Sequence, residues 1–324
     1  MSTTLWWAIL KSIRPTQWLK NVVLFAPLIF SGLLFSLQDN GIPYVLTVFY
    51  AFVIFCILAS SIYLINDIVD YEADRAHPFK SKRPIASGKL SIPIALFLSV
   101  VGIMLVFILS LALNTFFRVL VFTYLVLQIL YSTKLKKIPI VDVGAIAAAF
   151  VIRVYAGATV GYIHLNSWFL LTIISAALFL AVGKRQSERT LLSGTNNLGL
   201  TRKTLKRYSE RLLDQYTSIF ATSTWLSYSL FTFQYQFIRP DQNLSILYPN
   251  LPKILRPEKL LMLTVPLAIL GIMRYLQLIY EKNRGESPAR VLVEDKVLLT
   301  LVFLMGIMIV FILYGPPFLN DLLR

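Results

Sequence analysis

Long apolar runs separated by short charged stretches follow one another along nearly the whole chain. A run of about 20 apolar residues is long enough to cross a bilayer as a helix. Nine such runs predict membrane spans, at residues 20–38, 44–65, 91–113, 115–132, 139–162, 166–183, 216–237, 258–280 and 297–315. We therefore expect an all-α integral membrane protein, with one transmembrane domain over residues 1–324.

The composition agrees with this reading of the pattern. Hydrophobic residues make up 57% of the chain and charged residues 15%, and the mean hydropathy is +0.70. Soluble domains contain about 25% charged residues, so a soluble globular protein is excluded. The first ten residues lack an apolar core with a small-residue cleavage site, and no removable signal peptide is expected.

The net charge of +15 reflects membrane topology better than nucleic-acid binding, because the basic residues gather between the apolar runs. With a cytoplasmic N-terminus, the cytoplasmic loops are 66–90, 133–138, 184–215 and 281–296. These loops and the N-terminal segment hold most of the 31 Lys and Arg residues, which is the positive-inside pattern. We expect a plasma (inner) membrane protein with its active site on the cytoplasmic side.

One acidic motif follows the second apolar run directly. Asp67, Asp70 and Asp74 fall within about 60° of one another on a helix, whereas Glu72 points to the other side. Three carboxylates on one face repel one another unless a cation lies among them. Hard oxygen ligands suit Mg²⁺, with Mn²⁺ as the alternative ion. The competing interpretation is a solvated charged loop.

Basic residues come soon after this motif. Lys80 and Arg83 follow within one or two turns, which suggests a magnesium–diphosphate site. Lys20 and Asn21, at the start of the first run, are further candidates for phosphate binding. A membrane-surface anchor explains that segment equally well.

Two more groups of charges are candidates for binding anions. Asp142 and Arg153 lie on one helical face about three turns apart, either as an ion pair between helices or on the wall of a polar cavity. Lys184 and Arg185, with Glu188 one turn later, either determine topology or bind phosphate. The single cysteine Cys56 and two distant histidines argue against a zinc or iron site.

The motif resembles that of a known family. Asn66-Asp67-x-x-Asp70-x-x-x-Asp74 with Lys80-x-x-Arg83-Pro84 is similar to the UbiA superfamily of intramembrane prenyltransferases. The resemblance implies a nine-helix bundle around a central cavity that opens to the cytoplasm and laterally to lipid. Aromatic prenyltransferases of the superfamily carry a second aspartate-rich motif, but here the corresponding segment is Gly183-Lys184-Arg185-Gln186-Ser187-Glu188.

Four other segments resemble the decaprenyl-phosphate phosphoribosyltransferase branch. They are Arg14-Pro15-x-Gln17-Trp18-x-Lys20-Asn21, Tyr131-Ser132-x-x-Leu135-Lys136, Gly183-Lys184-Arg185-x-x-Glu188 and Ser287-Pro288. This branch implies Mg-dependent transfer of a 5-phosphoribosyl group from phosphoribosyl diphosphate to a polyprenyl phosphate, with release of pyrophosphate. The product is a precursor of lipid-linked arabinose for the cell envelope.

The expected metal-binding and catalytic residues are Asp67, Asp70 and Asp74. The expected substrate-binding residues are Lys20, Asn21, Asn66, Lys80, Arg83, Tyr131, Lys134, Asp142, Arg153, Lys184, Arg185 and Glu188. The nearest alternative function is an aromatic prenyltransferase of quinone or haem biosynthesis that uses an isoprenyl diphosphate. A transporter or channel is the alternative from another class. Membrane lipid is an expected partner, and the oligomeric state, a homo-oligomer included, stays open.

Overall fold

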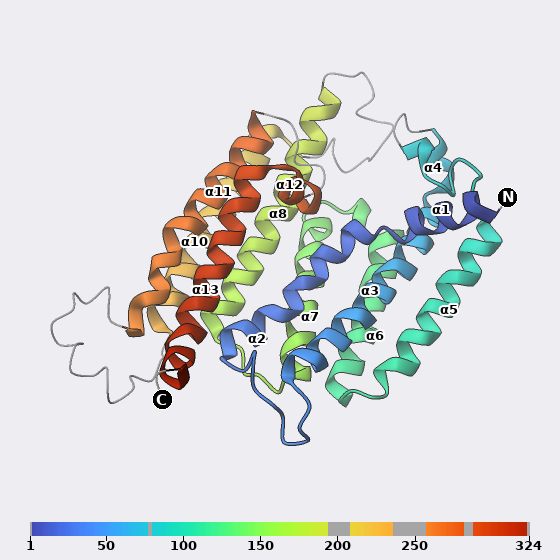
Figure 1. Cartoon of the computed structure of the whole chain (residues 1–324). Coiled ribbons are helices and arrows are strands. Elements are labelled where there is room, and N and C mark those ends of the chain that lie inside the picture. Colours follow the sequence, from blue (N-terminus) through green and yellow to red (C-terminus); the bar gives the residue numbers. More distant parts are fainter. Residues whose placement is uncertain (1, 77–79, 194–207, 236–256, 282–287, 323–324) are drawn as a thin grey trace. The chain divides into compact units, whose positions relative to one another are not determined.

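The structure is a computed structural model, which describes residues 2–76, 80–193, 208–235, 257–281 and 288–322 (Figure 1). The chain divides into two compact units. Unit 1 comprises Met1–Leu28, Ser36–Ile163 and Arg189–Ser209, and unit 2 comprises Ile29–Phe35, His164–Glu188 and Glu210–Arg324. The described residues are overwhelmingly helical, in agreement with the expected all-α class. A single domain over 1–324 and its central cavity stay predictions.

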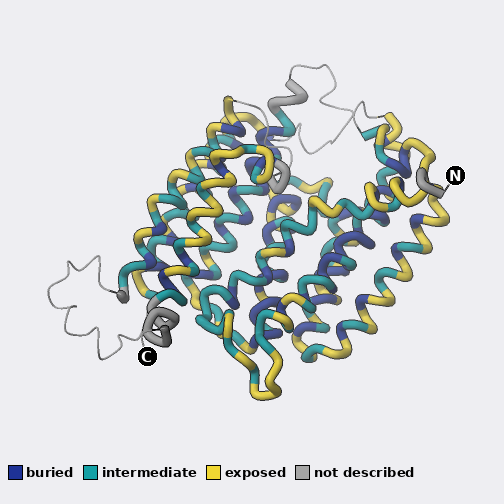
Figure 2. Tube along the Cα trace, in the orientation of Figure 1, coloured by how far each residue is buried: buried dark blue, intermediate teal, exposed yellow. Residues whose placement is uncertain are grey.

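Unit 1 is built around one long central helix. Its elements are α1 (Ser2–Ile13), η1 (Pro15–Phe25), α3 (Tyr44–Val69), α4 (Tyr71–Arg75), η2 (Lys80–Lys82), α5 (Ile92–Ser110), α6 (Thr115–Thr133), η3 (Leu135–Lys137) and α7 (Val141–Val160). Helix α3 packs against α1, η1, α5, α6 and α7. Figure 2 shows buried residues along much of α3 and exposed residues along α5. The acidic motif therefore extends from the best-packed helix of the unit.

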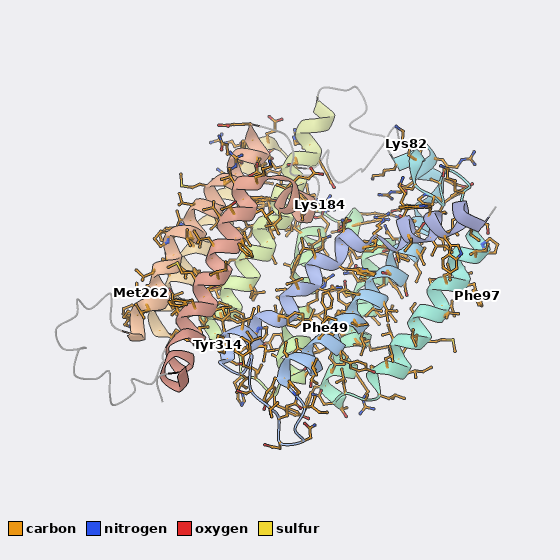
Figure 3. The ribbon with its side chains drawn as sticks, viewed as in Figure 1. Phe49, Lys82, Phe97, Lys184, Met262 and Tyr314 are labelled. Carbon is orange, nitrogen blue, oxygen red and sulfur yellow. The ribbon has the colours of Figure 1, made fainter. Side chains whose placement is uncertain are left out.

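Helix α5 turns large apolar side chains outward. Phe97, Met104 and Ile108 are each at least 60% exposed, and Figure 3 labels Phe97 on this helix. A soluble protein rarely leaves so many apolar side chains in contact with water. Acyl chains cover such a face without the free-energy cost that water would impose.

The first predicted span, 20–38, is not one continuous α-helix. The chain instead forms the 3₁₀ helix η1 and the short helix α2 (Ala26–Ser31). Arg14, at the start of η1, has the left-handed backbone angle φ 51°, and Pro15 follows it. The backbone of η1 lies against α7 at Gly157, where an added Cβ would fall 1.9 Å from the Leu24 carbonyl oxygen. A glycine is thus required at this contact.

Unit 2 contains the remaining long helices. They are α8 (Ser167–Ser193, its last turn belonging to unit 1), α10 (Glu210–Gln234), η7 (Pro257–Thr264), α11 (Val265–Tyr280), α12 (Pro288–Glu294) and α13 (Lys296–Leu322). Phe179, Ala221, Tyr275, Ile279 and Leu298 form a buried apolar cluster that joins α8, α10, α11 and α13.

Seven helices in the described part of the chain are long and apolar enough to cross a membrane. They cover Tyr44–Val69, Ile92–Ser110, Thr115–Thr133, Val141–Val160, Ser167–Arg189, Lys259–Tyr280 and Lys296–Gly315. These match seven of the nine predicted spans. The other two predicted spans correspond to η1 with α2 and to the more polar α10, so nine spans are not confirmed.

Candidate active site

The acidic motif lies where α3 ends and α4 begins. Backbone bonds from Asp70 N to Asn66 O (3.0 Å) and from Asp74 N to Asp70 O (2.8 Å) keep a helical path across the junction. Asp67 and Asp74 are almost fully buried, whereas the Asp70 side chain retains 28% exposure. Burial raises the pKa of the Asp74 carboxyl above its ordinary value, although the neighbouring Arg83 guanidinium acts in the opposite direction.

Arg83 brings two of these carboxylates together. Its Nη1 donates to Asp67 Oδ1 at 3.1 Å and to Asp74 Oδ2 at 2.5 Å. Because one guanidinium nitrogen reaches both, Asp67 and Asp74 share a face, as their spacing predicts. The carbonyl of Lys80 accepts the Arg83 backbone N–H at 2.9 Å and so fixes the turn that presents Arg83. Lys82, labelled in Figure 3, belongs to the same basic segment.

Arg14 contacts the motif from the N-terminal side. Its Nη2 donates to the same Asp67 oxygen, Oδ1, and its guanidinium lies 5.0 Å from the centre of the Tyr63 ring. The left-handed backbone at Arg14 ends α1 and starts η1, which directs this side chain toward the end of α3. Arg14 belongs to one of the sequence motifs, but its contact with Asp67 could not be predicted from local spacing, since 53 residues separate the two.

Lys136, in η3, reaches the third carboxylate. Its Nζ lies 2.5 Å from Asp70 Oδ1. Lys134, predicted as a substrate-binding residue, is exposed at the end of α6, and its role stays a prediction. The tight 3₁₀ turn of η3 sets which lysine of this loop points to Asp70. Tyr131, one helical turn before Leu135, is only partly buried, and Asn66 lies beside Asp67 on α3.

A divalent cation was the predicted partner of these carboxylates. Within the described residues, no three His, Cys, Asp or Glu side chains lie close enough together to hold a metal ion. Arg14, Arg83 and Lys136 neutralise the carboxylates instead. Asp67 Oδ2 is nevertheless buried with no hydrogen-bond partner among the described residues. A buried oxygen of this kind carries a free-energy penalty unless a cation or a hydrogen-bond donor contacts it. The oxygen donors of Asp67, Asp70 and Asp74 are the ligand chemistry that suits a hard divalent cation.

A second polar cluster in unit 1 surrounds Arg153 on α7. Arg153 is 5% exposed, and its Nε donates to Asn21 Oδ1 at 2.8 Å. Nη1 donates to the Ala149 carbonyl at 3.0 Å and Nη2 donates to the Tyr124 hydroxyl. Asn21 is completely buried on η1, with its amide 3.4 Å from Cys56 Sγ. Two predicted substrate ligands, Asn21 and Arg153, are thereby in direct contact.

Asp142 and Arg153 have separate partners in the described residues. The Tyr208 hydroxyl donates to Asp142 Oδ1 at 2.7 Å and accepts the Ile140 N–H at 2.6 Å. Asp142 and Tyr208 are both buried. Asp142 thus anchors the start of α7 to the segment that precedes α10. Sequence spacing alone did not reveal Tyr208, because 66 residues separate the two.

The basic candidates of unit 2 lie at the end of α8. Arg185 Nη1 donates to Glu188 Oε2, and Lys184 Nζ lies 3.9 Å from Glu188 Oε1. Arg185 is fully buried, whereas the Lys184 side chain is 31% exposed. Asp214 Oδ1 accepts from Gln186 at 3.0 Å and from Tyr280 at 2.8 Å, which ties α8 to α10 and α11.

Comparison with known proteins identifies the family. The model of the UbiA prenyltransferase family matches residues 24–238. This chain belongs to the UbiA prenyltransferase family. It is 37% identical over 230 residues to the decaprenyl-phosphate phosphoribosyltransferase of Mycolicibacterium smegmatis, which covers 69% of this chain and 70% of that protein. With the decaprenyl-phosphate phosphoribosyltransferase of Mycobacterium tuberculosis, identity is 36% over 231 residues, 70% of this chain and 74% of that protein.

A solved structure of a family member supports the fold. A UbiA homologue from Archaeoglobus fulgidus, bound to GPP and Mg²⁺, superimposes with a TM-score of 0.65 at 18% identity, over 94% of this chain and 99% of that one. The family match and the seven apolar helices make this UbiA protein an integral membrane transferase. At that identity the superposition shows the fold alone.

Proposed function

We propose that this UbiA protein transfers a 5-phosphoribosyl group from phosphoribosyl diphosphate to a polyprenyl phosphate and releases pyrophosphate. The observation that carries the proposal is the pairing of the three carboxylates of the acidic motif with Arg14, Arg83 and Lys136. The relatives named decaprenyl-phosphate phosphoribosyltransferase support the donor and acceptor classes. The proposed product is a lipid-linked sugar phosphate for the cell envelope.

Asp67, Asp70 and Asp74 would hold Mg²⁺, which supplies charge stabilisation to the diphosphate when it is bound. Arg14, Arg83 and Lys136, now paired with carboxylates, are the residues that would move to the diphosphate oxygens. An arginine fork matches phosphate oxygens geometrically, and a lysine contributes a point charge. The acidic motif thus keeps its basic residues in place until the donor arrives. Lys80 and Asn66 complete this proposed donor site.

The transfer forms a bond between a phosphate oxygen of the lipid and C1 of the ribose. The C1–O bond to pyrophosphate breaks, and pyrophosphate leaves with the electron pair. The lipid phosphate is already ionised at neutral pH, so no side chain has to remove a proton from it. The work of the protein is to orient the two substrates and to stabilise the leaving group.

Lys184 and Arg185 are the proposed ligands of the lipid phosphate. Glu188 lies within ion-pair distance of both in the structure, so a phosphate would compete with a carboxylate that is already bound. This exchange keeps a buried arginine paired before and after binding, which limits its desolvation penalty. Tyr131 and Asp142 remain proposed residues for substrate binding in unit 1.

The finer topology belongs to the same proposal. The protein would cross the plasma (inner) membrane nine times, with η1–α2 and α10 as spans in addition to the seven apolar helices. The N-terminus and the basic loops would then face the cytoplasm. Single-cysteine variants in the loops 66–90 and 281–296, on a Cys56→Ala background, test this with a membrane-impermeant thiol reagent. Labelling of these loops in intact cells would contradict the cytoplasmic orientation.

The proposed reaction is tested with labelled phosphoribosyl diphosphate, polyprenyl phosphate and Mg²⁺ on the full chain in detergent or vesicles. We expect labelled lipid and an equal amount of pyrophosphate. An isoprenyl diphosphate with 4-hydroxybenzoate is offered in a parallel reaction. Prenylation of the aromatic acceptor without labelling of the lipid would overturn the proposal in favour of an aromatic prenyltransferase.

A further inference from the structure

Arg153 is a buried cation that has no acidic partner among the residues that the structure describes. Its partners in the described part of the chain are a side-chain amide, a backbone carbonyl and a tyrosine hydroxyl, all of them neutral. A charge buried in this way is unfavourable unless a counter-charge compensates it. An arginine has five N–H donors, so the three bonds to Asn21, Ala149 and Tyr124 leave donors available.

The surroundings of Arg153 add positive charge rather than remove it. Lys20 adjoins Asn21, the η1 residue that Arg153 contacts directly, and Arg14 lies at the start of the same 3₁₀ helix. In a 3₁₀ helix, side chains three residues apart are aligned along one face. Arg14, Gln17 and Lys20 have this spacing, and Tyr63 contacts both Arg14 and Gln17. One face of η1 thus extends the positive charge from the acidic motif toward Arg153.

We propose that Arg153, Lys20 and Asn21 form a phosphomonoester site distinct from the acidic motif, and that this site takes the 5-phosphate of the sugar donor. The proposal rests on the proposed function and deepens it by separating the two anionic ends of the donor. The diphosphate end is assigned to the acidic motif and its bases. The monoester end is assigned to Arg153 on α7 and to Lys20 and Asn21 on η1.

Arg14 lies at the start of η1, the helix that carries Lys20, and this favours the sugar donor over the lipid as the source of the phosphate that binds here. Arg14 and Lys20 lie about two turns apart on η1, so one small molecule with a phosphate at each end can contact both. The lipid phosphate has its own proposed ligands, Lys184 and Arg185. A single donor therefore accounts for both clusters of unit 1.

The same site would select the class of donor. An isoprenyl diphosphate has an apolar chain where phosphoribosyl diphosphate has its ribose 5-phosphate. Placing an apolar chain against Arg153 and Lys20 leaves two cations desolvated and uncompensated. The site therefore rejects an apolar donor, which would leave both cations without a counter-charge, and accepts a phosphorylated donor. Enzyme sites reject a substrate analogue that leaves their buried polar groups unpaired for the same physical reason.

The test compares ribose 5-phosphate and pyrophosphate as inhibitors of the full-length wild type and of Arg153→Gln. We expect Arg153→Gln to weaken inhibition by ribose 5-phosphate about tenfold or more, because a charge-assisted hydrogen bond is lost. Inhibition by pyrophosphate should change far less. Arg153→Lys should recover part of the ribose 5-phosphate effect, and Arg118→Gln, on helix α6, is the matched control.

Direct binding keeps the test independent of turnover. Ribose 5-phosphate, but not ribose, should raise the unfolding temperature of the wild type, and Lys20→Gln should reduce that shift if Arg153→Gln fails to fold. The proposed site would be refuted if ribose 5-phosphate caused no shift in the wild type. It would also be refuted if Arg153→Gln weakened inhibition by ribose 5-phosphate and by pyrophosphate equally. A higher requirement for polyprenyl phosphate alone would assign the site to the acceptor and overturn the donor assignment.

Failure of the proposed function gives a different pattern. A wild type that transfers no phosphoribosyl group but is stabilised by ribose 5-phosphate through Arg153 would retain the phosphomonoester site and refute the reaction. A wild type that transfers the group, with inhibition by ribose 5-phosphate unchanged in Arg153→Gln, would refute only the site.

Discussion

Arg83 Nη1 lies 2.5 Å from Asp74 Oδ2, and this contact ties the segment that follows η2 to α4. The same nitrogen reaches Asp67, so one guanidinium satisfies two carboxylates whose mutual repulsion would otherwise destabilise the end of α3. The arrangement keeps acidic and basic groups in contact while no substrate is bound. Substituting Arg83 would therefore remove a cationic partner from both carboxylates at once, whereas substituting Asp74 would leave Arg83 paired with Asp67.

Asp67→Asn should reduce pyrophosphate release by about a hundredfold or more, since it removes one of the proposed metal ligands and its charge. Chelation with EDTA should abolish the wild-type reaction, and added Mg²⁺ should restore it. The matched control is Glu72→Gln, an exposed carboxylate in the same segment. Equal activity of Asp67→Asn and Glu72→Gln would rule out the metal role of Asp67.

Arg83→Gln should raise KM for the sugar donor about tenfold or more, because a charged hydrogen bond to phosphate is lost. Arg75→Gln is the control, since Arg75 is exposed and Tyr71 is the partner of its side chain among the described residues. Steady-state kinetics with a saturating lipid acceptor measures the difference. A rise in KM for the lipid alone would assign Arg83 to the acceptor.

Lys136→Gln and Lys134→Gln form a matched pair two residues apart. The structure places Lys136, not Lys134, against Asp70, so we expect Lys136→Gln to weaken donor binding about tenfold and Lys134→Gln to have little effect. Donor-dependent shifts in unfolding temperature measure this without turnover. The reverse order would show that η3 presents the other lysine to the site.

Gly157→Ala should destabilise unit 1 by about 1–3 kcal/mol, since the added Cβ would overlap the backbone of Leu24. It should also weaken donor binding, because η1 carries Lys20 and Asn21. Gly144→Ala is the control on the same helix: nothing lies within 4 Å of its added Cβ, and alanine favours a helix by about 1 kcal/mol. Thermal unfolding in detergent should therefore move in opposite directions for the two variants.

The sequence by itself determined the helical class, the membrane character and the acidic motif. Each depends on neighbours a few residues apart: apolar runs of sufficient length specify helices in lipid, and the spacing of Asp67, Asp70 and Asp74 places them on one face. These features survive in the structure because backbone hydrogen bonding within a helix is local. The family resemblance rested on the same short spacings.

Only the tertiary structure decided which side chains meet. It paired Asp70 with Lys136 rather than Lys134, and Asp142 with Tyr208 rather than Arg153. It also replaced the first predicted α-helical span with a 3₁₀ helix. Contacts between segments 50 or more residues apart depend on how helices pack and where loops turn, and local periodicity carries no information about either.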